Sequence, residues 1–138
     1  MITQAPPRAV AQDSAVQLLT KLSELHGGLM IHQSGGCCDG SAPMCYPVGD
    51  YRVGQRDVLL GEIELPDPLP AVRVWINGDQ FELWKHTQLI LDVVPGRGAG
   101  FSLEAPEGVR FLSRSRAFSP DENTALAEEP PKKGADFV

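Results

Sequence analysis

Residues 14–33 have the sequence SAVQLLTKLSELHGGLMIHQ, and this stretch decides the expected fold. Apolar residues recur in its first part at the three- and four-residue spacing of one helix face: Ala15, Leu18, Leu19, Leu22 and Leu25. Ser14 and Gln17 have the Ser-x-x-Gln spacing of a capping box, and two glycines at 27–28 end the pattern. The sequence therefore predicts an N-terminal helix that packs on a core, followed by a strand over residues 29–33.

Downstream of this helix, short apolar or alternating runs are separated by Gly, Pro, Asn and Asp, which is typical of strands joined by tight turns. The segment 79–87 is expected to form either a short helix or an irregular turn. The fold class is therefore α+β and mostly β, with one N-terminal helix packed on a compact β body. The predicted strands cover residues 29–33, 57–63, 72–76, 89–94, 101–104 and 109–111.

The length of the chain and its composition indicate one globular domain with two arms. Of 138 residues, 42% are hydrophobic and 22% are charged, which is close to the globular average. We expect residues 14–118 to form the domain. The polar, proline-containing ends, residues 1–13 and 119–138, are expected to be disordered, the second as an acidic tail. Deleting that tail should then leave thermal stability almost unchanged.

Charge and hydropathy exclude two classes of partner. The net charge is -6 and the Lys and Arg residues are scattered, so no basic patch favours nucleic-acid binding. The longest apolar runs fall far short of the ~20 residues that cross a bilayer, so no membrane partner is expected. The N-terminus has no apolar core with a cleavage site, and the expected compartment is the cytoplasm.

The segment 32–47, HQSGGCCDGSAPMCYP, holds the residues best suited to chemistry. Cys37, Cys38 and Cys45 offer three thiolates and His32 offers an imidazole, a set that zinc, iron and iron-sulfur clusters favour. Adjacent cysteines point apart in extended backbone, so one of the pair can be structural. Two alternatives stay open, a buried core cysteine and a disulfide from Cys45 to Cys37 or Cys38. The expected site is lined by Gly35, Gly36, Asp39 and Tyr46.

Residues outside this segment supply one further candidate ligand and no enzyme motif. His86, in the sequence WKHTQ, can add a ligand or a proton from across the fold. The alternative is a structural histidine that bonds to backbone at a strand entrance. The glycines at 96–100 precede a strand-like run and not a helix, so they do not predict a phosphate loop. No nucleophile elbow is present, and no enzyme is indicated.

Three arginines are expected beside the cysteine segment: Arg97, Arg114 and Arg116. Cationic neighbours would lower the pKa of a thiol and favour the thiolate, for a metal or for an electrophile such as an aldehyde. The alternative is that these arginines form ordinary surface ion pairs with residues such as Glu104 and Glu107.

Four stretches strongly resemble the bacterial family catalogued as domain of unknown function 779: residues 28–47, 57–62, 81–100 and 101–118. Such proteins are commonly met beside aldehyde dehydrogenases, so the resemblance implies an accessory role to such an enzyme.

A more distant resemblance is to the HesB-like A-type iron-sulfur carriers. It rests on the order of Gly36, Cys37 or Cys38, Tyr46, Gly100, Phe101, Pro106 and Phe118. This resemblance implies a HesB-like β body. The terminal cysteine pair of the carriers is replaced here by residues 111–116, FLSRSR, so two cluster ligands of the carriers are missing.

The sequence thus predicts a non-enzymatic metal-binding or thiol-bearing accessory protein. Its metal ligands would be Cys37, Cys38 and Cys45, with His32 or His86 as an auxiliary ligand. The cofactor would be zinc, iron or an iron-sulfur cluster, and the partner an aldehyde dehydrogenase or a second copy of the chain. The alternative is a protein-interaction module that docks on an aldehyde dehydrogenase, with buried structural cysteines and no metal.

Overall fold

A computed structural model describes residues 5–33, 43–49, 53–96 and 102–137. Within these ranges, seven strands form two mixed sheets, so the α+β class is confirmed. The strands are β1 (Ala9–Ala11), β2 (Leu29–Gln33), β3 (Met44–Pro47), β4 (Val58–Ile63), β5 (Val72–Ile76), β6 (Thr87–Pro95) and β7 (Val109–Ala117). The helices are α1 (Asp13–His26), α2 (Gly78–Trp84) and α3 (Pro120–Ala127), with short 3-10 helices η1 (Ala105–Glu107) and η2 (Gly134–Phe137).

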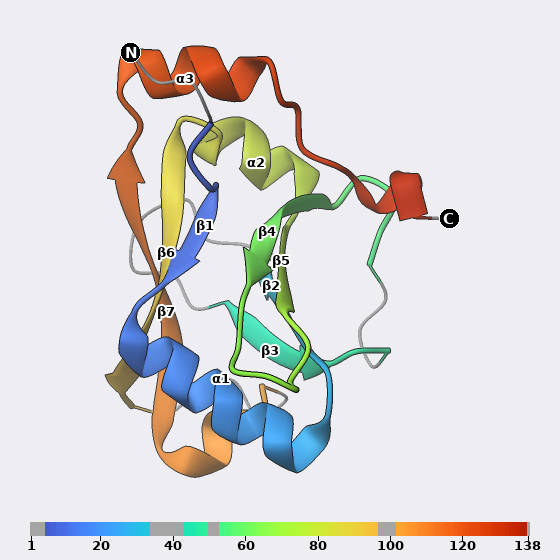
Figure 1. Cartoon of the computed structure of the whole chain (residues 1–138), viewed down its shortest axis with the longest axis vertical. Helices are drawn as coiled ribbons and strands as arrows, with labels where there is room; N and C mark the ends of the chain where they lie inside the picture. The colour runs from blue at the N-terminus through green and yellow to red at the C-terminus, as the bar shows by residue number, and fades with distance from the viewer. Residues whose placement is uncertain (1–4, 34–42, 50–52, 97–101, 138) are drawn as a thin grey trace.

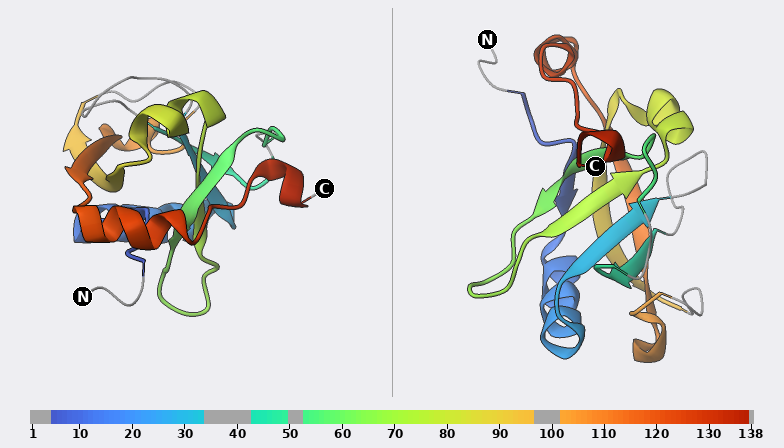
Figure 2. Two further views of the ribbon diagram at one scale, coloured as in Figure 1. Left: turned by 90° about the horizontal axis from the view of Figure 1, so that it is seen from above. Right: turned by 90° about the vertical axis from the view of Figure 1, so that its right-hand side faces the viewer.

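The two sheets share one core (Figure 1). One sheet has the order β1-β6-β7, with β1 parallel to β6, and the other has the order β3-β2-β5-β4, with β2 parallel to β5. Figure 2 shows the strands of the four-stranded sheet running obliquely to β6 and β7. A buried hydrogen bond of 2.8 Å, from Ser113 Oγ to Gln33 Oε1, joins the two sheets. The fully buried apolar side chains come from both sheets and from α1, among them Leu19, Ile31, Val74, Ile76, Leu91 and Phe111.

Helix α1 buries the apolar face that the sequence predicts, but it begins differently. Ala15, Leu19 and Leu22 are buried, whereas Leu25 is exposed. The predicted capping box is wrong, because the N-cap is Gln12 without a side-chain cap. The helix ends at Gly27, whose φ of 85° suits a residue without a Cβ.

Both ends of the chain carry regular structure where disordered arms are expected. Strand β1 pairs with β6 in register Val10↔Ile90, and α3 begins with a complete capping box between Ser119 and Glu122. Helices are therefore not confined to the N-terminus. The acidic composition of 119–138 obscured a Ser-x-x-Glu signal that was present in the sequence.

The C-terminal segment also bonds to the body of the protein. Leu59 N–H donates to the Lys132 carbonyl at 2.8 Å, and Gly134 N–H donates to the Asp57 carbonyl at 2.8 Å. Leu126 is buried. These contacts oppose the expectation that the tail contributes nothing to stability.

The remaining strand predictions differ in detail from the structure. The strands at 29–33 and 72–76 have the predicted bounds, and strand 109–111 extends to residue 117. The strand expected at 101–104 is wrong over 102–104, which form a turn before η1. Within the described part of the chain, no helix has both the length and the apolar character needed to span a membrane.

Candidate functional site

A buried polar pair beside the four-stranded sheet joins His32 to Asp57. His32 lies on β2, in register with Trp75 of β5 and Met44 of β3. Its Nε2 is 3.1 Å from Asp57 Oδ2, and the side chains are only 2% and 11% exposed. The Gly54 N–H donates to the same Asp57 oxygen at 2.8 Å. The Gly54 N–H therefore holds the carboxylate, which lies directly against the imidazole.

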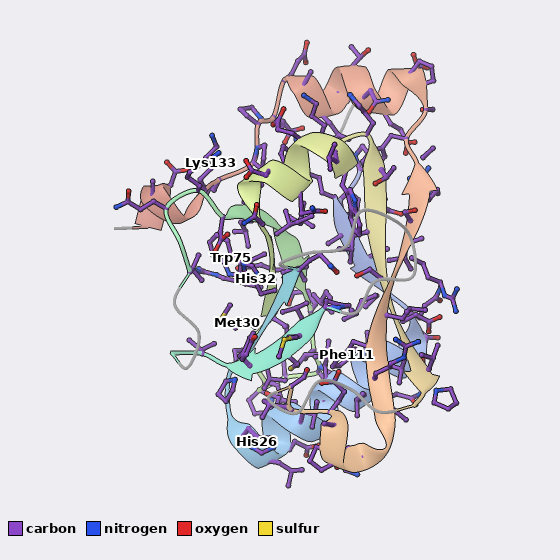
Figure 3. The ribbon with its side chains drawn as sticks, turned by 180° about the vertical axis from the view of Figure 1, so that it is seen from behind. His26, Met30, His32, Trp75, Phe111 and Lys133 are labelled. Atoms are coloured by element: carbon purple, nitrogen blue, oxygen red, sulfur yellow. The ribbon has the colours of Figure 1, made fainter. Side chains whose placement is uncertain are left out.

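This pair lies on the face of the sheet opposite the main core. Side chains alternate along a strand, so His32 and Met30 face away from Ile31, which is a core residue. Trp75 occupies the same outer face on the neighbouring strand and is also buried. Figure 3 shows Met30, His32 and Trp75 along one stretch of this sheet. The site is thus a second, smaller buried layer that mixes apolar and polar groups.

A carboxylate beside a buried imidazole changes the properties of the ring. It selects one tautomer, holds the ring in one orientation and makes the other nitrogen a better electron donor. Histidines that bind metals have this carboxylate arrangement, and a satisfied structural histidine has it too.

Cys45 occupies a very different place from His32. It lies on β3 opposite Ile31, is fully buried, and belongs to the main core. Its backbone N–H donates to Ser102 Oγ at 2.8 Å, and its carbonyl accepts from Leu103 N–H at 3.0 Å. The segment after the 96–100 glycines therefore closes the edge of β3.

The surroundings of Cys45 disfavour a thiolate. Burial, and then the charge of Glu104, raise the pKa of the Cys45 thiol far above its ordinary value. Glu104 is itself 1% exposed and accepts hydrogen bonds from the Ser102 hydroxyl and from Phe111 N–H. The expected lowering of the thiol pKa is thus wrong for Cys45, because the thiol is buried and its charged neighbour is the carboxylate of Glu104.

The arginines of β7 have carboxylate partners of their own. Arg114 Nε lies 2.6 Å from Asp92 Oδ2, and Arg116 Nη1 lies 3.0 Å from Glu122 Oε1. Ion pairing is what the alternative interpretation predicts, although the acidic partners differ from those named.

His86 lies in the short connection between α2 and β6, directly before the first residue of β6. Its carbonyl accepts from Phe118 N–H at 2.9 Å, and its Nδ1 is 3.2 Å from Asn123 Oδ1. The imidazole thus contacts a side chain, whereas the structural-histidine alternative expected it to bond to backbone. Among the residues that the structure describes, no three His, Cys, Asp or Glu side chains gather into a metal site.

Several predicted site residues lie outside the described ranges: Gly35, Gly36, Cys37, Cys38, Asp39 and Arg97. Tyr46 is described, and its hydroxyl donates to Met44 Sδ at 3.2 Å. Asp57, Ser102 and Glu104 were not predicted as site residues. No local spacing links Asp57 to His32, since the strand order β4-β5-β2 brings them together.

Comparison with known proteins identifies one family. The family model described as "Domain of unknown function (DUF779)" matches residues 18–117. No curated protein and no solved structure matches the chain.

Proposed function

The chain belongs to the DUF779 family, and we propose that it is a non-enzymatic accessory protein that binds a transition metal through thiols. The acting thiols are those of Cys37 and Cys38, and His32 is the auxiliary ligand. The observation that carries this proposal is the buried His32–Asp57 pair at the end of the strand that leads into the cysteine segment.

The chemistry of the donors supports this choice. Thiolates and imidazole are the ligands that zinc and iron favour, and the Asp57 carboxylate supplies the outer contact that orients a ligating histidine. Cys37 follows His32 by five residues, with Gly35 and Gly36 between them to ease a tight turn. Cys45 is not proposed as a ligand, because its surroundings favour the neutral thiol. His86 is not proposed as a ligand, because it lines a different part of the molecule, together with Arg8 and Phe81.

The proposal also includes a partner enzyme and an evolutionary origin. The family resemblance favours an accessory role to an aldehyde dehydrogenase in the cytoplasm. A HesB-like origin is supported by the order of helix, strand and cysteine segment. An iron-sulfur cluster usually takes four protein ligands, so for that cofactor two chains would each contribute Cys37 and Cys38 in a homodimer.

Elemental analysis of protein purified anaerobically without added metal tests the proposal. Wild type should carry about one zinc or iron ion per chain, or about two to four iron ions per homodimer where the cofactor is a cluster. His32→Gln should lose at least half of it, because ligand and outer contacts each change metal affinity by about 10–100-fold. His86→Gln is the matched control and should load like wild type. Less than about one ion per ten chains in wild type would reject the proposal.

A second candidate function is a protein-interaction module, favoured by large apolar side chains that are exposed: Leu25, Val48 and Leu83. Val48 is 68% exposed and stands beside β3. If this function is the true one, Val48→Ser should weaken co-elution with the dehydrogenase, whereas Cys37→Ser and Cys38→Ser should leave it unchanged.

A further inference from the structure

A cavity of about 270 Å³ lies where α2, α3 and the N-terminal arm meet, at the upper end of the molecule in Figure 1. Its position is separate from the His32–Asp57 pair, and the inference drawn from it does not depend on the proposed metal. The cavity is lined by Arg8, Phe81, Lys85, His86, Asn123, Leu126, Ala127, Pro130 and Pro131.

The chemistry of this lining is unusual for an acidic protein. The net charge of the chain is -6, yet two cations and an imidazole line the cavity, and its lining includes no carboxylate from the residues that the structure describes. The other walls are apolar, formed by the Phe81 ring, Leu126 and two prolines. Lys85 lies 3.0 Å from the Glu82 carboxylate, which partly neutralises it. Arg8 is therefore the main source of positive charge in the cavity.

The hydrogen bonds of Arg8 leave most of its donors available. Its Nη2 donates to the carbonyls of Leu126 at 3.0 Å and Glu129 at 2.7 Å, which fixes the guanidinium to the end of α3. Within residues 5–33, 43–49, 53–96 and 102–137, its Nε and Nη1 have no hydrogen-bond partner, and no carboxylate lies within ion-pair distance.

The charge of Arg8 is also incompletely balanced. Burial lowers the pKa of this guanidinium, and the nearby charge of Glu129 opposes that effect without reversing it. A partly buried cation without a carboxylate partner is costly, and an anionic ligand would offset the cost. His86 adds a second polar contact, because Asn123 holds its Nδ1 side and leaves Nε2 without a partner in the described chain.

We propose that this cavity binds a small organic monocarboxylate with an apolar body. The carboxylate accepts charge-assisted hydrogen bonds from the remaining N–H groups of Arg8. The apolar body packs against Phe81 and the prolines at 130–131. The volume is slightly below the range of drug-sized pockets, which limits the ligand to a short aliphatic or a single-ring acid.

Titration of the full chain with octanoate, 1-octanol and octylamine, followed by backbone amide NMR shifts, tests this site. Octanoate should cause saturable shifts of the amides of residues 81–86 and 123–131. Its affinity should be at least about tenfold higher than that of the other two probes. Equal binding of octanoate and 1-octanol would show a merely apolar surface. Absence of saturable octanoate shifts up to about 10 mM would also overturn the proposal.

Two variants separate the charge of the site from its shape. Arg8→Met should weaken octanoate binding at least about tenfold. Ala127→Phe keeps Arg8 but fills the cavity from an exposed helix position, and it should weaken binding to the same extent even if Arg8→Met loosens α3. Arg56→Met, at an exposed pair with Asp79, is the control and should bind like wild type. Unchanged affinity in Ala127→Phe would place the ligand elsewhere.

Discussion

His32 and His86 look alike in the sequence, since each lies beside an apolar strand run, but the fold gives them different surroundings. His32 is 2% exposed and its imidazole lies against a carboxylate. His86 is exposed, and its imidazole lies against the amide of Asn123 at the rim of a cavity. The comparison teaches that the partner and the burial of a histidine, more than its sequence neighbours, determine its chemistry.

The same contrast separates the two ends of the molecule. Around His32, strands from distant parts of the chain enclose a buried pair of an imidazole and a carboxylate, which suits a ligand held in one geometry. Around His86, the walls come from α2, α3 and the N-terminal arm, and the segment that closes the cavity is the C-terminal one. We therefore expect substitutions at the first site to affect stability strongly and at the second to affect it weakly.

The largest difference in stability between the two regions should follow removal of the side chain that contacts each histidine. Asp57→Ala breaks a buried pair and also removes the acceptor for Gly54 N–H, so the free energy of unfolding should fall by about 3 kcal/mol. Asn123→Ala, which removes the partner of His86, should change it by less than about 0.5 kcal/mol. Urea denaturation of the two variants measures both values. Similar losses in the two variants would remove the distinction between the histidines.

An intermediate effect should follow deletion of residues 119–138. This deletion removes the buried Leu126 side chain and the backbone hydrogen bonds to Asp57 and Leu59, which together should cost about 2 kcal/mol or more. The melting temperature should fall by roughly 6–10 °C. Deletion of 136–138 alone is the control, with a loss under about 1 kcal/mol. A full deletion that melts like wild type would restore the expectation of a disordered tail.

The smallest effect concerns Glu122, at the start of the helix that carries Asn123. The hydrogen bond from Arg116, followed by that from Ser119 N–H, lowers the pKa of Glu122 from 4.5 to about 2. Because the folded state favours the ionised carboxylate, its contribution to stability is complete above pH 4.5 and is lost as the pH falls toward 2.

Melting temperatures of wild type and Glu122→Gln between pH 7 and pH 2 measure this effect. The advantage of wild type should be constant above about pH 5 and should shrink below it. In the Arg116→Gln background the same substitution should show a smaller pH dependence, because the main cause of the low pKa of Glu122 is removed. An advantage that grows on acidification would contradict the assigned charge state.

Much of the fold could be predicted where local sequence and tertiary packing agree. The apolar runs at 29–33 and 72–76 are buried central strands, and the periodic face of residues 15–22 is buried in the core. Strand β3 was missed because Met44–Pro47 is short, ends in proline and lies within a segment that the cysteines suggested was a loop. Helix α3 was missed because composition was weighed above the capping signal at 119–122.

The sites were harder to predict because their members are far apart in the chain. Residue type alone identified His32, but only the order of the strands brings Asp57 to it. Cys45 has the same residue type as Cys37 and Cys38, and burial beside Glu104 distinguishes its thiol. Arg8 and Leu126 meet only after β1 pairs with β6 and α3 folds back.

The central claim is that Cys45 is structural and that Cys37 and Cys38 bind the metal. The metal content of two variants, measured side by side by elemental analysis, tests this claim most directly. Cys45→Ala should retain at least half of the wild-type occupancy, since a core thiol with a raised pKa is a poor ligand. The double variant Cys37→Ser, Cys38→Ser should retain less than about a tenth. Loss of metal in Cys45→Ala with retention in the double variant would contradict the account.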